Sequence, residues 1–539
     1  MGTEKSKGPA NPSAARQRML PMWRLMDSLL GGTESMRAAG KEYLIQHTGE
    51  AESRYQNRLA QATLWNQLEL TLGGWIGRPF RDPLKLNEDV PDEIKNISQD
   101  VDQLGTNIDT FARSWFYSGV SKAFCHVLIE QPQVLEREDG ERLSQEDSRR
   151  QGIRPYWCII EPDEVIAARS EVIDGQEAYV HVRIHEVTLE ADPKDAFAEL
   201  WVERIRVYDR VNNVVTVTVY RRDPEKSGDA KDDWPLDPDN PVTTLGINVI
   251  PMVTFYANRQ GFLLGKSPLQ DLAELNRRHW NSQSDQDNIL TIARFPILAA
   301  SGVTSIDGSD SLSGDPQAGR DFSGRTKGTV IGPFNVLVSE EVGSKYYYVE
   351  HKGAAIKSGQ DSLEKLEGKM AAYGSEFLKK SPDRQTATAR AMDSQESVSP
   401  LQAITLNFID AMQSALALTA RWMNLSSDET KVNETFHGGT ISLVTDFGPE
   451  DASGVDQALL TSMQQARVIS AQQMRREAKR RGVLSDDFDE DQNARELASE
   501  ALDLEQTQVP AAAKDLDPSE ESTEEDEKNE DRKKEDEDE

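Results

Sequence analysis

The chain has few cysteines and no long apolar run, and both deficits exclude classes of protein. Its 539 residues contain two cysteines, Cys125 and Cys158, so it has neither a disulfide framework nor a CxxC metal motif. Each cysteine lies in an apolar, strand-like stretch, where we expect a small, buried hydrophobic residue. No stretch approaches the ~20 apolar residues needed to span a bilayer, and the first residues lack the apolar core of a signal peptide. We therefore expect no membrane partner, and assembly in a cytoplasm.

Positive charge is also scarce. The chain has 61 Lys and Arg against 93 Asp and Glu, a formal net charge of −32. The segment 514–539 alone contains 15 acids and 5 bases. Tight DNA binding depends mainly on Lys and Arg that neutralise phosphates, so a chain this acidic is not expected to grip or read DNA. If duplex DNA is a partner, we expect it to be repelled rather than held.

The usual signatures of catalysis are weak or missing. The chain has no GxSxG nucleophile elbow, and its seven histidines form no cluster. His181 and His185 share a strand face, but four residues along a strand span ~13 Å, which is too far for one metal. We expect these histidines to be hydrogen-bonded or at the surface. The sequence therefore predicts no enzyme, no catalytic residue, no metal and no cofactor.

The nearest approach to an enzyme motif is GFLLGKS at residues 261–267. A phosphate-binding loop needs four residues between its glycines, and this stretch has three and is followed by Pro268. Lys266 and Ser267 remain the candidate residues of an alternative, P-loop-like nucleotide-binding enzyme. We favour a loop that only turns the chain into the following helix.

A long helix is predicted to follow that loop, over residues 267–293. Ser267 is a suitable N-cap, Pro268 suits the first helical position, and Pro296 ends the pattern. Its middle, residues 276–287, contains Trp280 as its one apolar residue. A helix that is polar on every side is not a core helix, so we expect it to bridge solvent or to pair with copies of itself.

Two more long helices follow. The first has an apolar seam of the a/d kind along one face, and a polar stretch at 381–390 separates it from the second. The seam consists of Ile356, Leu363, Leu366, Met370, Tyr373 and Phe377. The second helix is predicted to begin near Pro400 and to carry apolar residues from Leu401 to Trp422.

The remaining pattern favours an α+β fold. Residues 1–15 are expected to be disordered, and helices are predicted from residue 14 and over 50–72 and 94–117. Six strand-like stretches between 122 and 223 and one at 249–257 follow, with plain alternation of apolar and polar residues. Residues 436–447 read as a strand pair and 455–484 as a helix. From about 506 the chain is acidic and expected to be disordered.

Three stretches resemble the portal, or head-to-tail connector, proteins of tailed bacteriophages. They are GGTESMRAAGKEYLIQHTGEAESRYQNRLAQATLWN, IPMVTFYANRQGFLLGKSPLQDLAELN and QTATARAMDSQES. The similarity extends over roughly residues 30–500 and includes no catalytic motif. It implies an α+β portal fold, with an α/β wing, long stem helices, a small β-rich clip, a tunnel loop and a helical crown.

The resemblance also implies how the chain is divided. The parts are an N-terminal arm at 1–49, partly disordered and then helical, the wing at 50–265, stem helices at 266–298 and 354–380, the clip at 299–353, the tunnel loop at 381–392, a long helix with return strands at 393–450, the crown at 451–505, and a disordered acidic tail at 506–539.

By the same resemblance, the chain forms a homo-oligomeric ring, typically of twelve subunits, at one vertex of the capsid. The ring is the channel for packaging and ejecting double-stranded DNA, which passes without sequence specificity. Its partners are the major capsid protein, the terminase packaging motor and a tail adaptor. The location is then the virion, after assembly in the host cytoplasm. Another virion structural protein, such as a tail adaptor, is the alternative within this class.

Candidate site residues follow from the same parts. In the tunnel loop, the basic residues outnumber the one acid, Asp383, and they are expected to touch DNA. They are Lys379, Lys380, Arg384 and Arg390. In the stem helices, the candidates for contact with another subunit or with the channel are Arg277, Arg278, Leu363, Leu366 and Met370. The two arginines are expected to pair with acids of an adjacent subunit. The clip candidates for motor or adaptor contact are Asp307, Asp310, Asp315 and Arg320.

Overall fold

The computed structural model describes most of the chain up to residue 445 and short pieces beyond it. The described residues are 8–132, 152–222, 233–293, 297–301, 345–349, 353–375, 387–425, 438–445 and short pieces between 461 and 495, apart from single positions at 174, 193 and 241. Two compact units are present, Met1–Gly448 and Pro449–Glu539. All that follows concerns the first unit.

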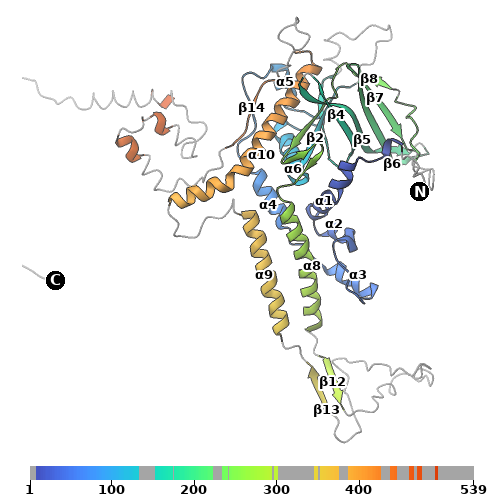
Figure 1. Ribbon diagram of the computed structural model, residues 1–539, viewed down its shortest axis with the longest axis vertical. Helices are drawn as coiled ribbons and strands as arrows, with labels where there is room; N and C mark the ends of the chain where they lie inside the picture. The colour runs from blue at the N-terminus through green and yellow to red at the C-terminus, as the bar shows by residue number, and fades with distance from the viewer. Residues whose placement is uncertain are drawn as a thin grey trace, which may run out of the picture. The chain divides into compact units, whose positions relative to one another are not determined.

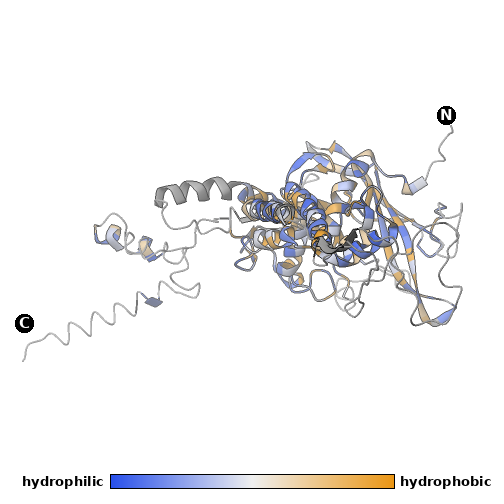
Figure 2. Cartoon of the chain, turned by 90° about the horizontal axis from the view of Figure 1, so that it is seen from below, coloured by the Kyte–Doolittle hydropathy of each residue, from blue (hydrophilic) through white to orange (hydrophobic). Residues whose placement is uncertain are grey.

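Helices and strands are mixed, which confirms the predicted α+β class (Figure 1). One sheet has five antiparallel strands in the order β4-β5-β6-β7-β8, and a second has three in the order β3-β2-β9. The predicted alternation is visible along the strands in Figure 2. The strands are β1 Lys85–Leu86, β2 Phe124–Glu130, β3 Tyr156–Ile160, β4 Val165–Ile173, β5 Gln176–Asp192, β6 Asp195–Val211, β7 Val214–Arg221, β8 Thr243–Thr244, β9 Met252–Tyr256, β10 Arg259–Gly261, β11 Leu264–Gly265, β12 Ile297–Ser301, β13 Lys345–Val349 and β14 Ile441–Ser442.

The helices of the N-terminal half are shorter than the sequence pattern predicts. They are α1 Ala14–Leu30, α2 Gly32–Ala39, α3 Glu52–Gln61, α4 Gln67–Ile76, α5 Asp92–Ile97 and α6 Ile108–Lys122. The single helix expected over 50–72 is wrong, because the chain breaks between α3 and α4. There Asn66 caps α4 by accepting from the Glu69 N–H at 3.2 Å and donates to the Leu29 carbonyl at 2.8 Å. The helix expected over 94–117 is interrupted between α5 and α6, and the gap contains Gly105, where the sequence already allowed a break and where φ is +89°.

The start of the chain is ordered earlier than expected. Residues 8–10 form a 3₁₀ turn, η1 Gly8–Ala10, instead of belonging to a disordered segment of 15 residues. Arg183 of β5 donates to the Pro9 carbonyl at 2.8 Å, and the Ser13 N–H donates to the Ile166 carbonyl of β4 at 3.0 Å. These contacts hold the segment on the five-stranded sheet, so the disorder predicted from its composition is wrong for these residues.

Three long helices form the middle of the chain: α8 Gln270–Ala293, α9 Ala354–Ser375 and α10 Ala387–Trp422. β12 and β13 lie between α8 and α9 and pair with each other, which agrees with a β-containing insert there. Figure 1 shows α8 and α9 side by side. Residues 387–392, expected in the tunnel loop, belong to α10. The stretch is rich in helix-forming residues, and the missing N–H of Pro400 removes only one bond inside a 36-residue helix.

The strand pair expected at 436–447 is also different. Within its described part, residues 438–445, β14 is the one strand, and it pairs with β1 from the N-terminal half of the chain. Gly439 has φ of +85°, and an added Cβ would lie 2.5 Å from Val90 Cα. Glycine at this position therefore lets the returning chain pass close to the loop that follows β1.

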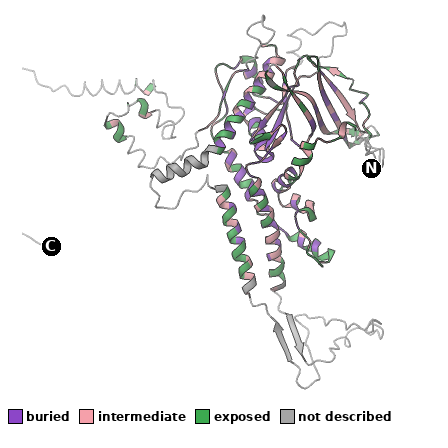
Figure 3. Cartoon of the chain, viewed as in Figure 1, coloured by how far each residue is buried: buried purple, intermediate pink, exposed green. Residues whose placement is uncertain are grey.

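The main core joins α10 to α6 and the three-stranded sheet, and Figure 3 shows buried residues along these elements. Phe408 of α10 lies at the centre, with its ring 4.9–6.0 Å from four other aromatic rings. Those rings belong to Phe80, Trp115, Phe116 and Phe255. Two indole N–H groups add polar ties, because Trp157 donates to Thr419 and Trp422 donates to the Ile129 carbonyl, both at 2.9 Å.

Both cysteines are apolar-core residues, as expected. Cys125 is fully buried on β2, and Cys158 is half-buried on β3. Burial raises the pKa of the Cys158 thiol to about 12, and the pKa of Cys125 also lies well above its usual value. Both thiols are therefore protonated at neutral pH. Within the described ranges, no helix is long and apolar enough to cross a membrane.

We expect Phe408→Ala to lower the free energy of unfolding by about 3–5 kcal/mol, because it leaves a cavity inside a fully buried aromatic cluster. Urea denaturation followed by tryptophan fluorescence measures this. Leu406→Ala on the same helix is the control, since Leu406 is 48% exposed. Equal losses in the two variants would contradict this account of the core.

Candidate functional site: the stem pair and the arm that holds it

The polar middle of α8 is buried within a single chain. Asn276, His279 and Ser284 are 0%, 1% and 3% exposed. The expectation that this helix bridges solvent or pairs with copies of itself is therefore wrong for these side chains. We call α8 and α9 the stem pair and residues 32–61 the arm; the arm, the start of α4 and α9 cover the polar middle of α8.

Asn276 fixes the break between α3 and α4. Its side-chain amide donates to the Trp65 carbonyl at 3.0 Å, and its carbonyl oxygen accepts from the Leu68 N–H at 3.1 Å. Both partners are backbone groups left free where one helix ends and the next begins. The amide nitrogen and the amide oxygen of the buried Asn276 are thus both hydrogen-bonded, and these bonds fix the path of the N-terminal chain along α8.

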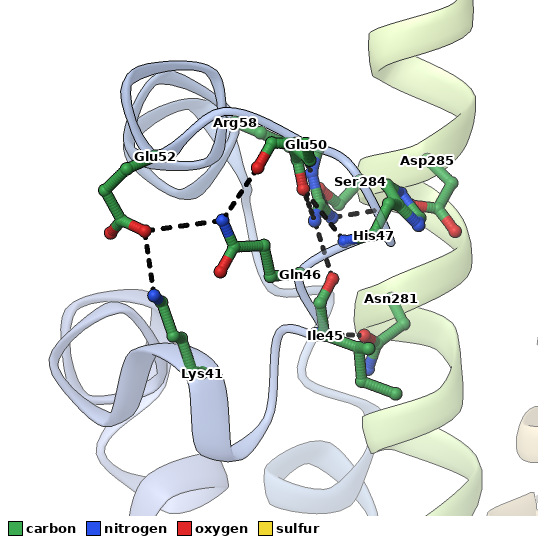
Figure 4. Close-up of polar contacts among 10 residues, drawn as sticks. All are labelled: Lys41, Ile45, Gln46, His47, Glu50, Glu52, Arg58, Asn281, Ser284 and Asp285. Atoms are coloured by element: carbon green, nitrogen blue, oxygen red, sulfur yellow. Dashed lines mark hydrogen bonds and ion pairs between the residues drawn. The ribbon is translucent and has the colours of Figure 1, made fainter.

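One turn further along, Asn281 repeats this arrangement with the arm. Its amide donates to the Tyr43 carbonyl at 2.6 Å, and its oxygen accepts from the Ile45 N–H at 3.0 Å. Figure 4 shows the second of these bonds, with Ile45 lying against α8. Two asparagines five residues apart therefore hold irregular backbone along α8, Asn281 that of the arm and Asn276 that of the junction before α4.

Arg58 of α3 completes the contact, and its side chain is 3% exposed. It bonds Glu50 through Nε and Nη2, at 3.0 and 2.9 Å, and donates to the Ile45 carbonyl at 2.6 Å. Its Nη1 lies 3.4 Å from Asp285 Oδ1 on α8 (Figure 4). Hydrogen bonds from Arg58 hold the pKa of Glu50 at about 2, so the pair is ionised at neutral pH. A buried pair of this kind is tolerated only when its donors and acceptors are satisfied, as they are here.

On its other side α8 packs against α9. The predicted seam is confirmed at Leu363, Leu366 and Met370, which are buried, whereas Ile356 is half-buried and Tyr373 is 37% exposed. The three buried side chains are covered inside the chain, and the contact with a channel or a second subunit expected for them stays a prediction. Packing of apolar seams within one chain satisfies the pattern equally well.

Polar contacts also join the stem pair. His279 Nε2 lies 3.1 Å from a carboxylate oxygen of Glu367, and Gln286 donates to the Ile356 carbonyl at 3.0 Å. Gly359 faces Gln286 so closely that an added Cβ would lie 2.2 Å from its Oε1. A glycine is therefore needed for the two helices to approach at this level.

The two stem arginines have different surroundings. Arg277 pairs with Glu274, one turn earlier on α8, at 2.8 Å, so its partner lies within the same helix. Arg278 is exposed. The half-exposed pair at Arg277 contributes little stability.

Lys266 and Ser267 do not form a phosphate cradle. Ser267 is fully buried; its hydroxyl donates to the Val120 carbonyl at 2.9 Å and accepts from the Leu269 N–H at 3.2 Å. Lys266 pairs with Asp271 at 3.1 Å. The preceding residues form the β10–β11 hairpin, where an added Cβ at Gly265 would lie 2.9 Å from the Asn258 carbonyl oxygen. The loop turns the chain into α8, as we favoured.

The histidines of β5 are hydrogen-bonded, as expected. His181 Nδ1 lies 2.6 Å from Asp209, and His185 Nε2 lies 3.3 Å from Glu203. Among the residues that can be placed, no group of three or more His, Cys, Asp or Glu is arranged to hold a metal.

A pocket of about 500 Å³ lies between the two sheets. Arg206 occupies its wall and pairs with Glu130 of β2 and Glu186 of β5. Tyr208 donates to Glu130 at 2.7 Å. Burial raises the pKa of the nearby Glu164 carboxyl to about 7. Because these charges pair with one another, we assign the cluster to holding the sheets together.

Several predicted site residues lie outside the described parts. They are Asp307, Asp310, Asp315 and Arg320 of the expected clip, and Lys379, Lys380 and Arg384 of the expected tunnel loop. Arg390 belongs to α10. Their roles stay predictions.

Sequence reasoning missed the Arg58 cluster, although a signal for it exists. Arg58 lies three residues after Tyr55 and four before Ala62, on the apolar face of its helix. A lone arginine on such a face predicts a buried cation, and Glu50 just before the helix is its natural partner. The role of α8 could not be read in this way, since Asn276 and Asn281 bond backbone groups more than 200 residues away.

Part of the chain is similar to a family without an assigned function. Residues 268–423, which span α8, α9 and α10, match the family described as "Domain of unknown function (DUF4055)". No curated protein matches.

Two solved structures are similar at a low level. One, titled "Virion of native gene transfer agent (GTA) particle", has 10% identity and a TM-score of 0.33 over 81% of this chain and 94% of that chain. Another, titled "Neck of empty GTA particle computed with C6 symmetry", has 11% identity and a TM-score of 0.35 over 76% and 88%. Scores at this level do not establish a shared fold.

We expect Glu50→Gln to make the free energy of unfolding less sensitive to acid. Because the pKa of Glu50 is lowered from 4.5 to about 2 in the folded chain, its contribution to stability is present above pH 4.5 and is lost as the pH falls towards 2. The variant is expected to be less stable at pH 7, because the buried Arg58 then keeps Asp285, at 3.4 Å, as its one carboxylate partner among the described residues.

Urea denaturation of both proteins between pH 7 and 3 measures this difference, which should shrink as the pH falls. Glu34→Gln is the matched control on the arm, since the Glu34 side chain is 84% exposed. A difference that stays constant with pH would show that Glu50 does not titrate in this window.

Proposed function

We propose that this chain is a phage-type portal protein. Copies of it form a ring, typically of twelve subunits, at one capsid vertex, and the ring is the channel for packaging and ejecting double-stranded DNA. The observation that supports this most directly is the stem pair, two long helices side by side with a paired β insert between them. The resemblance of three sequence stretches to portal proteins supports the same conclusion.

The dimensions of the stem pair suit a channel wall. With 24 and 22 residues, α8 and α9 are about 36 and 33 Å long at ~1.5 Å per residue. The chain leaves α8 into β12 and re-enters α9 from β13, so the insert lies at one end of the pair. In this proposal the stem pair bridges the clip at one end and the α/β wing at the other.

The charge of the chain supports a conduit rather than a DNA-binding protein. A wall with a net charge of −32 per subunit repels phosphates, so DNA slides past it. The tunnel-loop residues Lys379, Lys380, Arg384 and Arg390 supply local positive charge. Each contact is weak and screened, but a ring presents many copies to one duplex.

The remaining partners follow from the same proposal. The clip, with Asp307, Asp310, Asp315 and Arg320, contacts the terminase motor and the tail adaptor, and the wing contacts the major capsid protein. No cofactor takes part. Arg278 of α8 is available to an adjacent subunit or to the channel.

The purified chain is expected to form rings with an axial hole, either alone or with capsid or scaffold protein. Negative-stain microscopy and light scattering measure this. Lys266→Ala should leave the rings intact and abolish no activity, because Lys266 pairs with Asp271 outside any phosphate cradle. Monomers under all these conditions, or ATP hydrolysis that depends on Lys266, would refute the proposal; the second result would favour the nucleotide-binding enzyme.

The triple variant Lys379→Ala, Lys380→Ala, Arg384→Ala is expected to form rings but to retain several-fold less full-length DNA in assembled heads. Each lost cation removes a phosphate contact, and the loss is repeated around the ring. Quantifying DNA per head by gel or by cryo-microscopy tests this. The control replaces three exposed cations elsewhere, Arg54, Lys85 and Arg169. Normal retention in the tunnel-loop variant would exclude a role for its charge.

A further inference from the structure

The outer part of the five-stranded sheet is a two-stranded ribbon. β5 and β6 pair from His181 opposite Asp209 out to Asp192 opposite Asp195, but β4 leaves β5 at Ile184 and β7 leaves β6 at Arg204. Residues 186–202, which we call the ribbon, therefore have no further strand on either edge within the described residues. Two strands alone are marginally stable in water, so such a ribbon is expected to pack against something.

One face of the ribbon is apolar and exposed. Leu189 and Trp201 lie directly opposite each other and are 47% and 66% exposed, and Val187 beside them is 49% exposed. Phe197, in the same alternation near the turn, is 99% exposed. A cluster of this size on a soluble surface marks a contact site, and a half-exposed tryptophan is a typical anchor of one.

The same sheet face is covered closer to the body of the domain. There Ile205 and Val207 pack with Ala10 of η1 and with Trp234. The cover ends before the ribbon begins. The adjoining segments of the chain, MGTEKSK at 1–7 and DPEKSGDAKD at 223–232, have almost no apolar side chains to extend it. A second copy of the chain is therefore the better occupant.

The charges show which surface of that copy fits. The ribbon contains five acids and one lysine. Glu186 and Glu190 pair with arginines of the same sheet, which leaves Asp192, Asp195 and Glu199 as its remaining acids. Helix α1 has three arginines and one aspartate, a net charge of +2 in a chain that is otherwise strongly acidic. Arg18 and Arg24 lie on its exposed face, whereas Asp27 is held by Lys122 at 3.0 Å. On α9, by contrast, exposed lysines are interleaved with Asp361 and Glu364.

The outer face of α1 also has an apolar contact point. Pro21 lies inside the helix between the two arginines and is exposed. Proline in a helix interior removes a hydrogen bond and offers a rigid, flat ring, which an indole can cover. A tryptophan placed on Pro21 has arginine guanidinium groups on both sides, an arrangement that cation–π attraction favours.

We propose that the ribbon of one copy docks on the outer face of α1 in the next copy, with Trp201 over Pro21 and Glu199 near Arg18 or Arg24. This inference rests on the proposed ring and names the contact that closes it. The two surfaces differ, so the interface is heterologous and closes by rotation about one axis. The Ser13 N–H at the start of α1 donates to the Ile166 carbonyl of β4 in the same sheet, so both surfaces lie in one domain.

The test measures ring formation over a concentration series by light scattering and negative stain. Trp201→Ala, and separately Arg18→Glu with Arg24→Glu, should raise the concentration for half-assembly at least ten-fold. Glu199→Arg added to the double arginine variant should restore assembly towards wild type. Leu104→Ala is the matched control, since Leu104 is 86% exposed on a loop outside the ribbon.

Thermal unfolding of each variant shows that the chain itself is intact, because the changed side chains are exposed. Rings that form at the wild-type concentration in both the Trp201 and the arginine variants would overturn this inference and leave the ring proposal standing. A failure of Glu199→Arg to rescue would exclude α1 as the receiving surface. If the wild-type chain forms no ring under any condition, the proposed function itself fails.

Discussion

The need to satisfy the buried polar side chains in the middle of α8 determines how the N-terminal half of the chain is placed. Asn276 bonds the backbone of Trp65 and Leu68 at the start of α4, and Asn281 bonds that of Tyr43 and Ile45 in the arm. An unpaired buried amide costs about 1–3 kcal/mol, so the bonds of the buried Asn276 select one path for the chain before α4, and Asn281 holds the arm beside it. Arg58 then fixes that path from the other side through Glu50 and Asp285. The arm is in this sense a folded cover for α8.

The other end of the stem pair is anchored differently. There α10 crosses the three-stranded sheet, and its attachment is aromatic and apolar, with Phe408 at the centre. The indole bonds of Trp157 and Trp422 orient the helix on the sheet. Apolar packing provides most of the free energy, and the few directional bonds specify the register. The stem pair thus lies between the polar contacts of the arm and the apolar core around Phe408.

Local sequence patterns predicted which helices and strands form better than they predicted where each of them begins and ends. Alternation found all the long strands, and the seam of α9 was visible because Leu363, Leu366 and Met370 repeat at helical spacing. The break between α3 and α4 was not predictable, because Asn276, more than 200 residues away, stabilises it. For the candidate site, the sequence placed Arg277 and Arg278 on α8 but assigned the helix to solvent or to copies of itself. The spacing of apolar residues alone does not show whether the polar face of a helix is exposed to water or is hydrogen-bonded to the backbone of another segment.

That distinction changes where a ring must find its contacts. A polar helix exposed to water would have offered its side chains to a neighbouring subunit. In this chain the start of α4, the arm and α9 already bond the side chains of Asn276, Asn281 and Gln286, respectively, which leaves fewer polar groups of the α8 middle for a second copy. A cluster of uncovered apolar side chains lies instead on the ribbon of β5 and β6. In the ring that we propose, subunit contacts based there would leave the stem pair free to act as a rigid wall, because the bonds described above that hold it are internal to each chain.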